Sequence, residues 1–213
     1  MDGLNVLIVR HICGTIWTLA YLLIIRRSFI DKNYGIPLIP TMMNVGWEAF
    51  DFFYAEKSYM GNYSMLWLIL DLIILYQIII YMGKGRFKTP FALCLKSIGG
   101  SLLWFMILIA SEKLNIEIIT GAFFQNGLMS ILFIHFILKR KNISGQSIYI
   151  AILKMAGTAI IYIPVMYIGG LPLSLKLIAY PIYLTIFAGD LAYIFLYVKY
   201  FKQSHKGSIW LRV

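Results

Sequence analysis

Apolar residues fill seven long stretches of this chain, and short polar segments separate them. Each stretch holds about 20 residues, the length at which an α-helix crosses roughly 30 Å of hydrocarbon. We place the spans approximately at residues 6–25, 36–54, 63–82, 91–110, 117–138, 148–168 and 175–198. The segments between them are rich in Gly, Pro, Lys and Arg, as loops are. The pattern predicts an all-α polytopic membrane protein, with seven transmembrane helices in one bundle and a single domain over residues 1–213.

Composition supports the membrane assignment. The chain has 213 residues, of which 61% are hydrophobic and 13% charged. A soluble domain is about half apolar and about a quarter charged. Water-soluble globular folds are therefore disfavoured, and little sequence remains for a separate soluble domain.

The net charge of +10 is distributed in a way that predicts the orientation of the chain. Basic residues follow the first, third, fifth and seventh spans: Arg26, Arg27 and Lys32; Lys84, Arg86 and Lys88; Lys139, Arg140 and Lys141; Lys199, Lys202, Lys206 and Arg212. The alternate loops carry far fewer. The positive-inside rule then places the amino terminus outside and the carboxyl terminus in the cytoplasm, across a bacterial plasma membrane or, in a eukaryote, the endoplasmic reticulum. A nucleic-acid partner is disfavoured, because its basic footprint would be contiguous.

Four acidic residues, Glu48, Asp51, Asp71 and Asp190, lie inside the predicted spans. A charged side chain in hydrocarbon is costly, so such an acid usually faces a bundle interior and suggests a functional site. Because successive spans run in opposite directions, Glu48, Asp71 and Asp190 fall at similar middle depths. We therefore expect these three carboxyl groups to converge around one apolar chamber, with Asp51 secondary.

Polar and aromatic residues share helix faces with these acids. Asn44 precedes Glu48 by four residues and Trp67 precedes Asp71 by four, spacings that place side chains on one face. The face of Asp190 carries aromatic rings at spacings of three or four: Tyr183, Phe187, Tyr193 and Tyr197. An uncharged acid in an apolar pocket can donate a proton, and aromatic faces can stabilise a passing cation. These features meet the requirements of polyene cyclisation.

Other interpretations of the same acids stay open. They can hydrogen-bond neighbouring helices, or pair with Lys96 or Lys154, although both lysines lie near cytoplasmic helix ends and are expected to snorkel. Intramembrane acids also form proton relays, so a small proton-coupled seven-span transporter or channel is the alternative function. No repeat between the first and last three spans supports that alternative. A non-catalytic membrane partner or receptor is a third possibility.

The segment Asn44-Val-Gly-Trp47-Glu48 resembles the Asn-x-x-Trp-Glu signature of the membrane-integral terpene cyclases of fungal meroterpenoid and indole-diterpene pathways and their bacterial relatives. Further segments resemble the same family in the same order: Cys13-Gly-Thr-Ile-Trp17 through Tyr21, Trp67-Leu-Ile-Leu-Asp71, Gln125-Asn-x-x-Met129-Ser130, Gly145-Gln-Ser147, Lys154-x-x-Gly157-Thr158 and Gly189-Asp190-Leu-Ala-Tyr193. The similarity extends over most of the chain.

This resemblance implies an enzyme of the lyase or isomerase type, with no cofactor and no metal. It implies a hydrophobic prenylated substrate, whose terminal epoxide or alkene is protonated by an acid before a carbocation cascade closes the rings. The two family acids fall on Glu48 and Asp190, and Asp71 matches a further acidic position. Together with the chemistry above, it makes Asn44 and Gln125 candidate orienting residues. The candidate pocket walls are Trp47, Trp67, Phe187 and Tyr193.

Missing motifs agree with this interpretation. The sequence has no Asp-Asp-x-x-Asp run to hold magnesium on a diphosphate, and no Asp-x-Asp-Asp motif of the soluble protonating cyclases. It also has no Gly-rich phosphate loop or nucleophile elbow. The lipid bilayer is the expected environment, while the oligomeric state is not encoded in any recognisable pattern.

Overall fold

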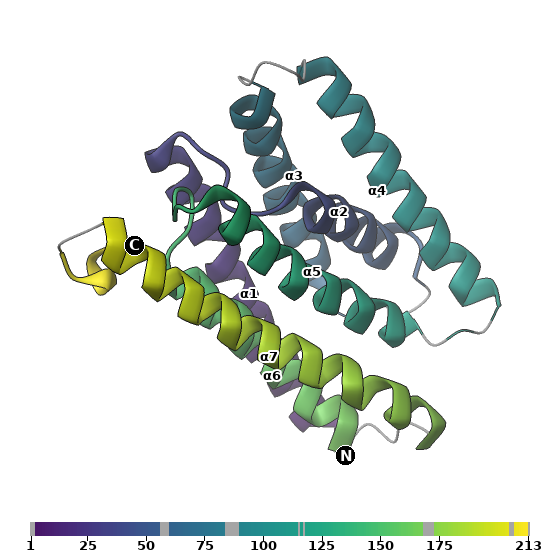
Figure 1. The fold of residues 1–213 in the computed structure, drawn as a ribbon. Coiled ribbons are helices and arrows are strands. Elements are labelled where there is room, and N and C mark those ends of the chain that lie inside the picture. Colours follow the sequence, from purple (N-terminus) through teal and green to yellow (C-terminus); the bar gives the residue numbers. More distant parts are fainter. Residues whose placement is uncertain are drawn as a thin grey trace. The chain divides into compact units, whose positions relative to one another are not determined.

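The computed structural model describes residues 3–55, 60–83, 90–114, 116, 118–167, 173–204 and 207–212. Secondary structure within these residues is entirely helical, which confirms the predicted fold class. The elements in chain order are α1 (Gly3–Asp31), α2 (Leu38–Phe53), α3 (Asn62–Gly83), α4 (Pro90–Lys113), α5 (Ile118–Arg140), α6 (Ile148–Tyr167), α7 (Leu173–Ser204) and the short 3₁₀ helix η1 (Ile209–Leu211) (Figure 1). Several residues of the predicted loops, Lys57, Lys84, Arg86, Lys88 and Lys206, lie outside the described residues.

Five helices are long and apolar enough, in their described residues, to cross a membrane. These segments are Ile8–Asp31, Asn62–Gly83, Pro90–Lys113, Thr120–Arg140 and Lys176–Ser204. The corresponding stretch of α6, Ile148–Tyr162, is apolar but shorter. α2 has 16 residues and is about 24 Å long, short of roughly 30 Å of hydrocarbon. The second predicted span is thus a shorter helix than expected, since Pro37 precedes its first turn with an extended backbone.

The chain divides into two compact units. The central unit comprises Tyr21–Gly121 and Ser144–Gln146. The terminal unit comprises Met1–Ala20, Ala122–Ile143 and Ser147–Val213. The predicted single bundle over the whole chain stays a prediction, and each unit is described by itself below.

In the central unit, α2 packs against both α3 and α4 (Figure 1). Gly46 lies at the closest approach of α2 and α4, where a Cβ atom would be 2.6 Å from the Ser101 carbonyl oxygen. One turn earlier along α2, the Met42 side chain lies against Gly100, where an added Cβ atom would be 2.7 Å from the Met42 sulfur. Gly46 and Gly100 therefore allow close packing of α2 and α4, whereas Gly99 has open space around it.

Loop segments of the central unit are tied together through backbone groups. The Asp31 carboxylate accepts a hydrogen bond from the Gly145 amide at 2.7 Å and pairs with Arg27. The Gln146 side chain donates to the Gly35 carbonyl at 3.4 Å. Gly145 has a φ of +78°, and a Cβ at Gly35 would meet its carbonyl oxygen at 2.0 Å. Two glycines are needed here, one for a left-handed backbone and one for the close approach.

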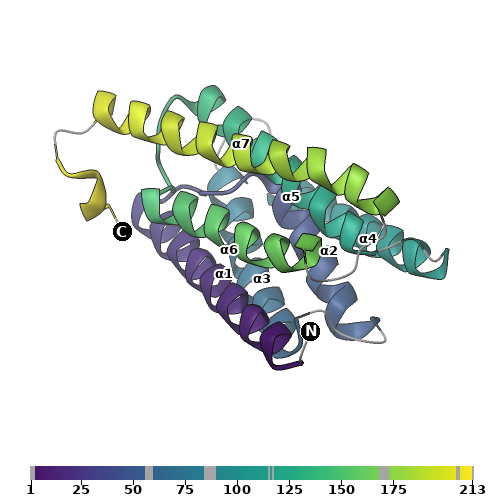
Figure 2. The same cartoon turned by 90° about the horizontal axis from the view of Figure 1, so that it is seen from below.

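In the terminal unit, α6 packs against α7, and the first half of α1 runs beside α6 (Figure 2). The Cys13 thiol donates to the Gly157 carbonyl at 3.5 Å. A Cβ atom at Gly157 would be 2.7 Å from Nε1 of Trp17, so this glycine provides room for an indole ring. The segment that includes η1 returns to α6, where the Tyr149 hydroxyl donates to the Trp210 carbonyl at 3.0 Å.

Candidate functional site

Two of the predicted acids meet inside the central unit. Glu48 on α2 is 4% exposed and Asp71 on α3 is fully buried. Glu48 lies close enough to both Asp71 and Asp51 for electrostatic interaction. The structure therefore brings three of the four predicted acids into one neighbourhood. We call Glu48, Asp71, Asn44 and Tyr21 the acid cluster.

Asp71 is held by donors from two other helices. The Asn44 amide donates to Oδ1 of Asp71 at 3.4 Å and to the Tyr21 hydroxyl oxygen at 3.0 Å. The Tyr21 hydroxyl in turn hydrogen-bonds Asp71. These two donors fix the position of the Asp71 carboxyl group beside Glu48. Tyr21 was not among the predicted site residues; its only sequence signal is its place in a family-like segment.

Glu48 has a different environment. Its Oε2 atom is buried and, like Oδ2 of Asp71, has no hydrogen-bond partner among the described residues, but the donors Asn44 and Tyr21 hold Asp71 and not Glu48. An ionised carboxylate in such a position is very costly, whereas the neutral acid carries no charge into the apolar interior. With an acid neighbour on α3, Glu48 is suited to hold a proton and to donate it. The acid cluster thus contains one candidate donor, Glu48, and one hydrogen-bonded acid, Asp71.

Asp51 joins the end of α2 to the beginning of α3. Its Oδ2 atom accepts hydrogen bonds from the Met60 amide, at 3.3 Å, and from the Ser64 hydroxyl. Both contacts fix the connection between the two helices. This is a structural role, and it agrees with the secondary place that Asp51 had among the predicted acids.

Replacing either partner of the hydrogen bond between Ser64 and Asp51 should destabilise the central unit. We expect Asp51→Asn and Ser64→Ala each to lower the free energy of unfolding in detergent by about 2 kcal/mol, because a hydrogen bond to a charged group is lost. The double variant should lose less than the sum of the single losses, since both changes remove one shared interaction. Fully additive losses would show that the two side chains act separately.

The predicted walls Trp47 and Trp67 are both buried in the central unit. The Trp67 ring meets the Tyr21 ring edge-on, with centroids 6.1 Å apart. Trp47 packs against Phe50 at 6.4 Å between centroids. The Trp67 ring therefore contacts the acid cluster at Tyr21, while the contact of either tryptophan with a substrate stays a prediction.

Asp190 lies in the terminal unit and is ion-paired. It is 2% exposed, and its Oδ1 atom lies 2.5 Å from Nζ of Lys154, which is 3% exposed. The expectation that Lys154 snorkels to the interface is therefore wrong: the carboxylate replaces the water that the ammonium group would otherwise seek. The alternative pairing of an acid with Lys154 is confirmed. The predicted chamber shared by Glu48 and Asp190 involves both units and stays a prediction.

The other predicted residues of the terminal unit differ in exposure. Tyr193 is buried and packs edge-on against Phe133, with centroids 5.1 Å apart. Gln125 on α5 is also buried. Phe187 is 40% exposed and stacks on Tyr183 at 6.3 Å. The aromatic face predicted around Asp190 is thus buried at Tyr193 and partly exposed at Phe187.

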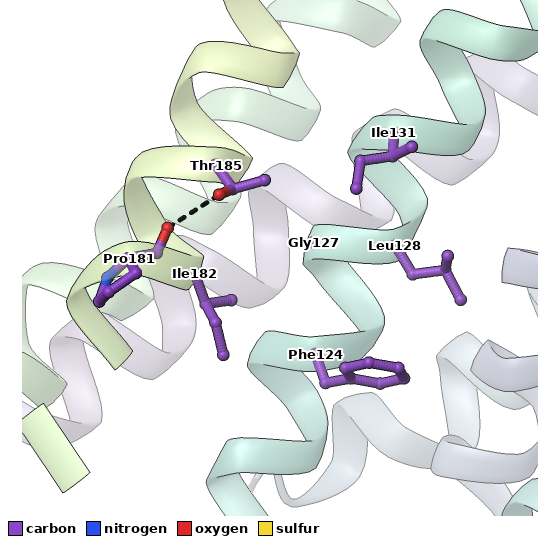
Figure 3. A pocket seen from close by; sticks show the side chains of 7 residues that line it. All are labelled: Phe124, Gly127, Leu128, Ile131, Pro181, Ile182 and Thr185. Carbon is purple, nitrogen blue, oxygen red and sulfur yellow. Dashed lines mark hydrogen bonds between the residues drawn. The ribbon is translucent and has the colours of Figure 1, made fainter. Parts of the chain in front are cut away.

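An apolar groove lies between α5 and α7 in this unit (Figure 3). Its volume is about 250 Å³, and almost all of its lining is apolar. Gly127 on α5 leaves room beside Ile182, and Pro181 interrupts the helix bonding of α7. The Thr185 hydroxyl donates to the Pro181 carbonyl at 2.9 Å, so this polar group has an internal partner. The groove suits an aliphatic chain.

Comparison with known proteins identifies the family. Residues 4–206 match the sequence profile of the Pyr4-like transmembrane terpene cyclases. The chain belongs to this family. Membership of the transmembrane terpene cyclases confirms the resemblance found in the sequence, and together with the five apolar helices it identifies an integral membrane protein.

Three curated fungal proteins are similar to parts of the chain. Terpene cyclase macJ of Penicillium terrestre is 30% identical over 69 residues, 32% of this chain and 27% of macJ. Asnovolin H synthase nvfL of Aspergillus novofumigatus is 29% identical over 83 residues, 38% of this chain and 34% of the synthase. Pyr4-family terpene cyclase mfmH of Annulohypoxylon moriforme is 36% identical over 64 residues, 30% of this chain and 26% of mfmH. The matches thus span 26% to 34% of the length of these relatives. No solved structure matches the chain at a significant level.

Proposed function

We propose that this chain is a membrane terpene cyclase that protonates a terminal epoxide or alkene of a prenylated substrate, with Glu48 as the general acid. One observation carries the proposal: a buried Glu48 carboxyl group with an unpartnered oxygen lies beside the hydrogen-bonded Asp71, in a chain of the transmembrane terpene cyclase family. Family membership supports the reaction class, and the acid cluster supports the choice of donor.

The proposed reaction needs only protons and the electrons of the substrate. Glu48 transfers its proton to the epoxide oxygen or to the terminal alkene carbon. In the epoxide case the C–O bond breaks, its electron pair becomes part of a hydroxyl group, and positive charge develops on the more substituted carbon. Each neighbouring double bond then supplies an electron pair for a new ring bond and moves the charge along the chain. Loss of a proton from the last cation gives a product isomeric with the substrate.

The residues around Glu48 would orient this step. Asn44 and Tyr21 hold Asp71 in place, so its polar carboxyl group stays fixed near the site where the cation forms. Electrostatic groups that are fixed before the reaction stabilise a charged transition state without reorganisation. The Trp47 and Trp67 rings offer apolar walls that can stabilise a cation through their faces.

The substrate would enter sideways from the lipid. The apolar groove of about 250 Å³ on the terminal unit suits the aliphatic tail of such a substrate. A cavity of about 150 Å³ holds a six-carbon benzene ring, so the groove is large enough for roughly two isoprene units.

We also propose that the amino terminus lies outside and the carboxyl terminus in the cytoplasm, because Arg26, Arg27, Lys139 and Arg140 lie near the ends of α1 and α5. Accessibility of terminal tags in intact cells tests this orientation.

The reaction is tested with membranes that contain the full chain. They are incubated with farnesyl- and geranylgeranyl-bearing acceptors, with and without a terminal epoxide. We expect products of unchanged mass and shorter chromatographic retention. If the chain converts no acceptor across a broad panel but carries protons across liposome membranes, the transporter alternative is correct.

A further inference from the structure

The buried ion pair of the terminal unit is built from three side chains on three helices. Nζ of Lys154 on α6 lies 2.5 Å from Oδ1 of Asp190 on α7 and 2.8 Å from the hydroxyl oxygen of Ser130 on α5. The Ser130 hydroxyl is itself 2.8 Å from the same Asp190 oxygen. All three side chains are buried. Every polar contact of Asp190 among the described residues is therefore made through Oδ1.

We infer that Lys154 is a positioning residue that holds Asp190 as a carboxylate, so that Asp190 acts as an acceptor and not as the acid that starts the reaction. An ammonium group has only donors to offer, and its natural partner is an ionised acid. Two charges withdrawn from water are tolerated only with close pairing and further hydrogen bonds, which Ser130 supplies here. This inference rests on the proposed function for its chemical meaning, but not for its protonation state.

The ion pair leaves one oxygen of the Asp190 carboxylate without a hydrogen-bond donor in the part of the chain that the structure describes. Oδ2 of Asp190 is buried and has no partner among the described residues. The hydroxyl of Tyr193, one turn further along α7, is also buried and unpartnered within the described residues. The Phe133 ring packs against Tyr193 and lies 5.9 Å from the Lys154 ammonium group. An oxygen held in this way can accept a hydrogen bond from a donating group of a terpenoid substrate that reaches it, such as a hydroxyl.

Infrared spectroscopy of the purified full chain tests the inference without a substrate, since protonated carboxyl groups absorb apart from carboxylates. The double variant Lys154→Met with Asp190→Asn removes both charges, a change that buried pairs often tolerate. We expect its spectrum to keep every protonated carboxyl absorption of the wild type. Loss of one such absorption would show that Asp190 is normally protonated and would overturn the inference. The single variant Lys154→Met should gain one absorption that the double variant lacks, and a folded single variant without this gain would also contradict it.

A variant in which Lys154 and Asp190 exchange their charges tests whether the pair positions a carboxylate for the reaction or only packs the helices together. In Lys154→Asp with Asp190→Lys the pair is restored but the carboxylate is moved to α6. We expect normal accumulation of this variant with conversion reduced at least about 100-fold, the size of effect seen when a preorganised electrostatic group is lost. Lys154→Arg, which keeps the charge, should retain most conversion. Conversion at the wild-type rate in the exchanged variant would overturn the acceptor role. If the wild type converts nothing, the proposed function fails and the infrared result still decides the state of Asp190.

Discussion

Replacing Glu48 with glutamine should lower conversion of a prenylated substrate by about 10²–10⁴-fold, the usual contribution of a general acid. The side chain is buried, but the amide has nearly the shape of the protonated acid, so the chain should still fold. What the variant loses is the proton that starts the cation. Conversion is measured as the rate of isomeric product formed per amount of chain in the membrane. The infrared spectrum of the same variant should lack one protonated carboxyl absorption of the wild type.

Two comparisons make this result specific. Glu112→Gln makes the same chemical change near the end of α4, outside the acid cluster, at a residue whose Oε2 is also buried and unpartnered among the described residues. It should leave conversion within about two-fold of the wild type if the place of Glu48 beside Asp71, and not burial alone, makes the donor. Asp71→Asn should reduce conversion less than Glu48→Gln, because Asp71 is placed as a supporting carboxyl group. Greater loss in Asp71→Asn would exchange the two roles. Equal conversion in Glu48→Gln and wild type would remove Glu48 from the mechanism while leaving the fold unaffected.

The helices themselves could be predicted from hydrophobic length alone. An apolar run of about 20 residues between basic loops has few alternatives to a helix in lipid, because every backbone group must find a partner within the segment. α3, α4, α5 and α6 accordingly begin and end within a few residues of the predicted spans. The predictions were less accurate for α7, which extends to Ser204, and for α1, which continues to Asp31. In both helices the backbone hydrogen bonding continues past the apolar segment into polar residues, to Asp31 in α1 and to Ser204 in α7.

The side chains that contact the acidic residues were harder to predict than the acidic residues themselves. Spacing along one helix places Asn44 and Glu48 on a common face, but it does not show which other helix lies opposite. Lys154 was misassigned because its distance from a helix end suggested snorkelling, whereas its partner Asp190 is 36 residues away in sequence. Tyr21 was missed because tyrosines in membrane spans are usually interfacial or packing residues. Its contact with Asn44 depends on how α1 meets α2, which no local pattern encodes.

Replacing Gly46 with alanine should have a second large effect, on stability, because Gly46 determines how closely α2 approaches α4. An alanine Cβ there would lie 2.6 Å from the Ser101 carbonyl oxygen and 3.1 Å from the Phe105 amide nitrogen. Both atoms belong to the backbone of α4, so no side-chain rotation can relieve the overlap. We expect Gly46→Ala to lower the free energy of unfolding by about 1–3 kcal/mol, the usual cost of overpacking. The gain from replacing a helical glycine, about 0.5–1 kcal/mol, offsets only part of this loss.

The matched control is Gly99→Ala on α4, where nothing lies within 4 Å of the added carbon. There only the helical preference for alanine acts, so this variant should be as stable as the wild type or more stable. Both variants are compared by thermal unfolding in the same detergent. Since Gly46 lies two residues before Glu48, its variant should also lose conversion, through displacement of the carboxyl group by the shift of α2. Equal stability of the two variants would mean that α2 and α4 are further apart than described, and the position of Glu48 beside Asp71 would then lose its support from helix packing.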